Sequence, residues 1–153
     1  MAPARAEPLR LPDMGDPSSV ALPAAKEREL GQAIMQEVRR RLPLEHDLEI
    51  NAYVADLGQR LASHAGGEYS FHFFVVDDPR INAFALPGGH IGINTGLLLQ
   101  ASAESELASV VAHEIAHITQ RHIARRIAAS QGSGLRSTAM LLAAILIGSQ
   151  NPQ

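Results

Sequence analysis

Residues 113–117 read His-Glu-Ile-Ala-His, an HEXXH pattern inside a segment with helical periodicity. Two histidines four residues apart lie on the same side of a helix, one turn apart, so both rings can reach a single metal ion. Apolar residues recur around the pattern at the spacing of a buried helix face: Val110, Val111, Ile115 and Ile118. The chain is therefore expected to pack this helix against a core and to carry a metal site on it.

Glu114 lies between the two histidines, where it can project beside the ion without binding it. Zinc lowers the pKa of a coordinated water towards neutrality, and a neighbouring carboxylate can then take a proton from that water. The attack of the resulting hydroxide on a peptide carbonyl is the reaction that this spacing serves. We expect His113 and His117 to bind one Zn2+ and Glu114 to act as the general base. A structural His-Glu-His group is the alternative, and it would need its own hydrogen-bonding network.

The third protein ligand that a catalytic zinc normally takes is not evident. His122 lies nine residues after His113, about 180° around a continuous helix, and is expected to face away. The metzincin spacing needs Gly at position 120 and His at position 123, where this sequence has Gln120 and Ile123. Glu114 is also the last acidic residue of the sequence. Within the chain, His90 is the remaining alternative for the third ligand.

The composition limits the class of protein. A chain of 153 residues has the size of one domain, and 46% hydrophobic with 19% charged residues is typical of a soluble globular protein. A formal charge of -3, a pI near 6.1 and 4% aromatic residues argue against a nucleic-acid partner. Cysteine is absent from the sequence, which excludes disulfides, cysteine zinc sites and thiol nucleophiles.

Periodicity predicts an α+β fold with N-terminal helices, a small sheet and a long HEXXH helix. Residues 1–25 hold five of the nine prolines and are expected to form an extended arm, followed by the body of the domain at 26–130. The glycines around the second strand allow close backbone approach, so this strand could lie at a sheet edge beside a cleft. A plain hairpin or loop boundary is the alternative. The expected helices are 26–42, 48–64 and 102–129, the last with Ser102 as N-cap, and the expected strands are 71–76 and 90–94.

Residues 131–153 contain a Gly/Ser break at 131–134 and an apolar segment at 139–147. This segment has about half the length of a membrane-spanning helix. Four arginines make the C-terminal third basic, so it could touch an anionic membrane surface. A solvated helix face followed by a buried helix is the alternative.

Several stretches together resemble a known family. They are 82–89 (NAFALPGG), Ile91, 94–98, 113–122 (HEIAHITQRH) and 11–15 (LPDMG). In this combination the chain resembles the HEXXH zinc metallopeptidase family of HtpX and the CAAX-prenyl endopeptidases, most closely its soluble periplasmic branch. The likeness covers about residues 9–130.

The resemblance implies a zincin-like (gluzincin) metalloprotease domain with His113 and His117 as zinc ligands and Glu114 as general base. It also implies that one strand pairs with extended substrate by strand addition, through Gly89, His90, Ile91, Gly92, Ile93 and Asn94. In the family the third ligand is a glutamate on a later helix, which this sequence does not contain. The chain is therefore expected to be an apparently truncated, N-terminal half of such a domain, ending at Gln153.

The function implied by the resemblance is zinc-dependent hydrolysis of peptide bonds in envelope or outer-membrane protein quality control. The expected partners are unfolded or misassembled protein substrates, and the expected location is the periplasm. The alternative is a catalytically incomplete fragment that acts as a protein-interaction module, because its third zinc ligand is absent.

Overall fold

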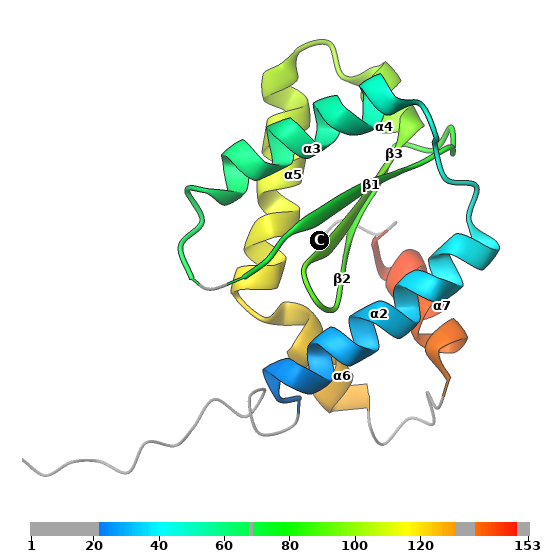
Figure 1. Cartoon of the computed structure of the whole chain (residues 1–153), viewed down its shortest axis with the longest axis vertical. Coiled ribbons are helices and arrows are strands. Elements are labelled where there is room, and N and C mark those ends of the chain that lie inside the picture. Colours follow the sequence, from blue (N-terminus) through cyan, green and yellow to red (C-terminus); the bar gives the residue numbers. More distant parts are fainter. Residues whose placement is uncertain (1–21, 68, 131–136, 150–153) are drawn as a thin grey trace, which may run out of the picture.

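The computed structural model describes residues 22–67, 69–130 and 137–149 (Figure 1). Most of the expected arm 1–25 and the expected break 131–134 lie outside these residues. The elements are α2 (Ala24–Arg41), α3 (Leu48–Ala62), β1 (His72–Val76), β2 (Ala83–Leu86), β3 (His90–Asn94), α4 (Thr95–Gln100), α5 (Glu104–Thr119), α6 (His122–Ser130) and α7 (Thr138–Ser149). The prediction of helices combined with a small sheet is confirmed.

The sheet lies between two layers of helices, α3 and α5 on one face and α2 and α7 on the other (Figure 1). Both faces are apolar because strand side chains alternate between them. In β1, Phe73 and Val75 pack with α3 and α5, whereas Phe74 and Val76 pack with α2 and α7. The two clusters of buried residues therefore form on opposite sides of one sheet.

The strand order is β1-β3-β2, which makes β3 the central strand. Strand β3 pairs with β1 in the parallel direction and with β2 in the antiparallel direction. The turn that joins β2 to β3 contains Gly88 and Gly89, both with φ of +82°. A Cβ at Gly92 would overlap the rings of Phe84 and Phe74, so glycine lets the two rings meet over the central strand. The expectation that 90–94 is an edge strand is wrong, because the glycines serve this turn and this ring contact.

The segment 102–129, expected to be one helix, is divided into α5 and α6. Gln120 and Arg121 lie between the two helices. Arg121 has φ of +55°, and its guanidinium donates to Leu22 O at 2.8 Å and to Glu27 at 3.4 Å. These partners lie almost a hundred residues earlier in the chain, so local periodicity carries no sign of the break.

Ser102 is not the N-cap of α5 as expected. The cap position is Ala103, and Ser102 donates through its backbone N–H and its Oγ to the carboxylate of Glu106, at 3.0 and 2.7 Å. The glutamate in the first turn thus reaches back to the residues that precede the helix, as in a capping box. The helix begins two residues later than predicted.

The apolar segment 139–147 lies within α7, which packs on α2 and β2. Leu142 is 2% exposed in that interface, whereas Met140 and Ile147 are 49% and 68% exposed. Among the residues that the structure describes, none of the helices has the length and apolar character required to cross a bilayer.

Candidate metal centre

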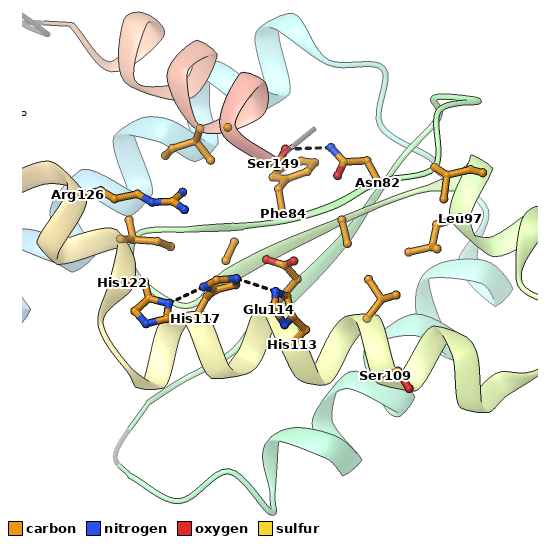
Figure 2. A pocket seen from close by; sticks show the side chains of 17 residues that line it. Asn82, Phe84, Leu97, Ser109, His113, Glu114, His117, His122, Arg126 and Ser149 are labelled. Atoms are coloured by element: carbon orange, nitrogen blue, oxygen red, sulfur yellow. Dashed lines mark hydrogen bonds between the residues drawn. The ribbon is translucent and has the colours of Figure 1, made fainter. Parts of the chain in front are cut away.

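Helix α5 presents His113, Glu114 and His117 on one side, with one possible ligand atom of each within 4.8 Å of the others (Figure 2). The Nε2 atoms of the two histidines are 2.9 Å apart, and their rings are nearly perpendicular, at 88°. The adjoining side of the helix holds it against the sheet through Leu107, Val111, Ile115 and Ile118. The helix is therefore fixed by its apolar side, and its two imidazoles converge on one point.

The three side chains fit a zinc ion. Two nitrogens bound to a tetrahedral zinc lie about 3.3 Å apart, given Zn–N bonds of about 2.0–2.1 Å. The two rings would thus have to separate by a few tenths of an ångström from the observed 2.9 Å. Across the described ranges, no other set of three histidine, aspartate or glutamate side chains is close enough to hold a metal. This part of the chain supplies two histidine ligands and an adjacent carboxylate.

Glu114 is largely withdrawn from solvent. Burial raises the pKa of its carboxyl to about 7, and the positive charge of Arg126 opposes this rise. A carboxyl with a pKa near neutrality can both take and return a proton, which suits a general base. Burial, followed by the neighbouring His113 and His122, lowers the pKa of His117, so its imidazole is neutral around pH 7.

A cleft of about 520 Å³ opens over the histidines (Figure 2). Its walls come from β2, α5, α6 and α7, and the guanidinium of Arg126 on α6 points into it. At the far side, Asn82 Nδ2 donates to Ser149 Oγ at 2.9 Å, which joins the start of β2 to the end of α7. The cleft is large enough for several residues of a peptide.

His90 is not the third ligand. It does not line the cleft, and its ring stacks on His72 with centroids 5.1 Å apart and planes 28° apart. Burial, helped by His72 and Arg39, lowers the pKa of His90 to about 4. The suggestion that His90 completes the metal site is therefore wrong, because its strand carries it to another part of the molecule.

The strand that borders the cleft is not the one that was expected to bind substrate. The expected residues, Gly89 to Asn94, belong to the central strand and its turn, and both sides of that strand are already paired. The strand that borders the cleft is β2, through Ala83, Phe84 and Ala85. In the sequence these residues belong to the NAFALPGG stretch, which is the feature that points to them as part of the site.

His122 does not face away from the site as expected. Its Nδ1 lies 2.6 Å from His117 Nδ1, because the chain turns between α5 and α6. Neither His122 nor the cleft-lining Arg126 was singled out from the sequence as a site residue, since both positions depend on that turn.

Comparison with known proteins gives a consistent result. Residues 49–152 match the family described as peptidase family M48. The putative beta-barrel assembly-enhancing protease of Vibrio cholerae is 39% identical over 151 residues, which are 98% of this chain and 31% of that protein. The beta-barrel assembly-enhancing protease of Escherichia coli K12 is 39% identical over 94% of this chain and 30% of its own length. The mitochondrial metalloendopeptidase OMA1 of Schizosaccharomyces pombe is 35% identical over 67% of this chain and 32% of its own length. The chain spans about a third of the length of these relatives.

Proposed function

The chain belongs to peptidase family M48, and from this membership we propose that it forms part of a zinc-dependent metalloendopeptidase. The observation that carries the proposal is the convergence of His113 Nε2 and His117 Nε2 beside the buried carboxyl of Glu114. All three groups line a cleft that can take a peptide.

Each of the three residues has a separate task. His113 and His117 would hold zinc through Nε2. When bound there, zinc would supply Lewis acidity to a water molecule and to the carbonyl of the substrate. Glu114 takes a proton from the attacking water at its carboxylate and delivers it to the nitrogen of the leaving amine. The burial that raises the pKa of Glu114 makes both transfers accessible near neutral pH.

Substrate binding is proposed at the free edge of β2. Within the described residues β2 is the last strand of the sheet, and no strand pairs with its outer side. An extended peptide can add there as a further strand, held by main-chain hydrogen bonds. Ala83 and Ala85 line the cleft with small side chains, which leaves room for those of a substrate. Recognition of this kind favours unfolded or misassembled proteins over one fixed sequence.

The third zinc ligand is proposed to be a glutamate on a later helix, as the family resemblance implies. It is not among the described residues. We also propose a role in envelope or outer-membrane protein quality control, with the periplasm as the location of the activity. The name beta-barrel assembly-enhancing protease, which relatives carry, supports this proposal.

The test replaces Glu114 by Gln in the complete polypeptide that carries this sequence. We expect zinc content to remain and hydrolysis of unfolded casein to fall by about 10²- to 10⁴-fold, because only proton transfer is removed. Glu49→Gln, an exposed carboxylate on α3, is the matched control and is expected to leave both unchanged. Proteolysis that survives in Glu114→Gln would contradict the role of Glu114.

A further inference from the structure

The turn between α5 and α6 brings a third histidine to the metal centre. In a continuous helix His122 would follow His117 by about 140° around the axis, too far for contact. In the structure the two Nδ1 atoms are 2.6 Å apart, and their rings meet at 61° with centroids 4.8 Å apart. Figure 2 shows His122, His117 and His113 joined in a row by hydrogen bonds.

Specific contacts hold this turn. Arg121 adopts a left-handed backbone conformation that costs an arginine about 1 kcal/mol or more. Its guanidinium donates to Leu22 O and to the carboxylate of Glu27, and the Arg121 and Glu27 side chains are only 20% and 13% exposed. A partly buried ion pair to the start of α2 therefore offsets the backbone cost and fixes the direction in which α6 leaves.

The row of hydrogen bonds has two possible proton arrangements. His117 uses both ring nitrogens, with Nε2 facing His113 and Nδ1 facing His122. If His122 donates, the proton of His117 must sit on Nε2, which blocks that atom for a metal. If His117 donates from Nδ1, its Nε2 carries a lone pair on the side of His113.

We propose that His122 is a positioning residue that accepts a hydrogen bond from His117 Nδ1–H and thereby holds His117 in the tautomer whose Nε2 can bind zinc. The partner of a ligating histidine commonly fixes its tautomer and ring orientation in this way. His122 then carries its own proton on Nε2. The proposal rests on the metal site of the proposed function, but its first test needs no metal.

The first test reads the tautomer of His117 directly. Long-range ¹H–¹⁵N correlation spectra of the metal-free chain, labelled with ¹⁵N-histidine, are recorded at pH 8, where ordinary imidazoles are neutral. We expect the Nδ1–H form to dominate at His117 and to give way to the Nε2–H form in His122→Ala. A dominant Nε2–H form at His117 in the unchanged chain would overturn the proposal.

The second test measures the affinity for Zn2+ of the same variants by competition with a chromogenic chelator. His122→Ala is expected to weaken binding by about 10- to 100-fold, whereas His122→Asn, whose Oδ1 can accept the same hydrogen bond, retains most of it. His64→Ala, an exposed histidine at the end of α3, is the control for loss of a surface imidazole. Equal affinity in His122→Ala and the unchanged chain would refute the positioning role. If the unchanged chain, which lacks the proposed third ligand, binds zinc too weakly to titrate, the affinities are measured in the complete polypeptide that carries this sequence. Weak binding there as well would count against the proposed function, while the tautomer still decides the role of His122.

Discussion

Among the residues that the structure describes, histidine rings meet in two regions, and only one of these regions is suited to a metal. His113 and His117 on α5 are nearly perpendicular, with their Nε2 atoms facing each other. His72 and His90 on β1 and β3 are stacked, with their planes 28° apart. The lone pair of an imidazole nitrogen lies in the plane of its ring, so perpendicular rings can converge on one ion while stacked rings direct their lone pairs side by side.

The charged surroundings of the two pairs differ as well. The helix pair has the carboxyl of Glu114 beside it, which balances the charge of an ion. At the strand pair, burial, His72 and Arg39 lower the pKa of His90, and among the described residues no carboxylate joins this pair in a group that could hold a metal. An arginine also lies near the helix pair, where burial, the neighbouring histidines and Arg126 lower the pKa of His117, so the carboxyl of Glu114 is what distinguishes the two pairs. Two neighbouring histidines are therefore not sufficient evidence of a metal site, since ring orientation and local charge decide the matter.

The largest effect is expected on the affinity for zinc, which a change in the helix pair should lower and a change in the strand pair should not. His113→Ala is expected to weaken zinc binding by more than about 100-fold, because a ligand contributes more than a supporting residue. His72→Ala, which removes an exposed ring from the strand pair, is expected to leave the affinity unchanged. Isothermal titration with Zn2+ measures both. A comparable loss in the two variants would mean that the strand pair also takes part in binding.

The strand pair is expected to make the free energy of unfolding depend on pH, through the lowered pKa of His90. The pKa of His90 falls from its ordinary 6.5 to about 4 on folding, so the unfolded chain binds more protons between these values. The stability is thus complete above about pH 6.5 and decreases as the pH falls through this window towards 4. Because the ring keeps some contact with solvent, we expect a decrease of about 2 kcal/mol at most.

Urea unfolding at pH 7.5 and pH 4.5 measures this decrease, with His90→Gln as the comparison. The variant cannot titrate at this position, so its curve is expected to be flatter over the same interval. Parallel curves for the variant and the unchanged chain would assign the pH dependence to other groups.

A smaller effect is expected where the turn between α5 and α6 contacts α2 through Arg121. Glu27→Gln removes the charge opposite Arg121 in a pair that is mostly buried, and it should lower the free energy of unfolding by about 1 kcal/mol. Glu29→Gln breaks an exposed pair with Lys26 on the same helix and should cost less than about 0.5 kcal/mol. Chemical denaturation compares the two variants. A larger loss for Glu29→Gln would argue against a supporting role for Arg121.

The features that could be predicted from the sequence are those determined by residues close to one another along the chain. The helices α2 and α3 follow from apolar spacing and the residues that end them, and residues 113 and 117 share a face because four residues make about one turn. The alternation of apolar residues also located β1, and the glycines on either side of residues 90–94 located β3. Each of these features depends on neighbours within a few positions.

What could not be predicted depends on distant partners. The central place of β3 is decided by β1 and β2 pairing on either side of it, which its own glycines do not reveal. His122 was expected on the far side of a continuous helix, and it reaches His117 because Arg121 is held by Leu22 and Glu27. Ring orientation at His72 and His90 likewise follows from strand pairing between residues 18 positions apart.

The contacts of Arg121 have a consequence for the order in which the site forms during folding. The two proposed ligands are four residues apart, so they come together as soon as α5 is helical. The contacts of Arg121 close loops of 94 and 99 residues, and such closure is slow because the chain must give up much conformational freedom first. His113 and His117 are therefore expected to be adjacent early, and His122 to join them only after α2 has docked. A zinc ion encountered by a newly made chain would meet a pair of ligands before the residue that orients one of them has arrived.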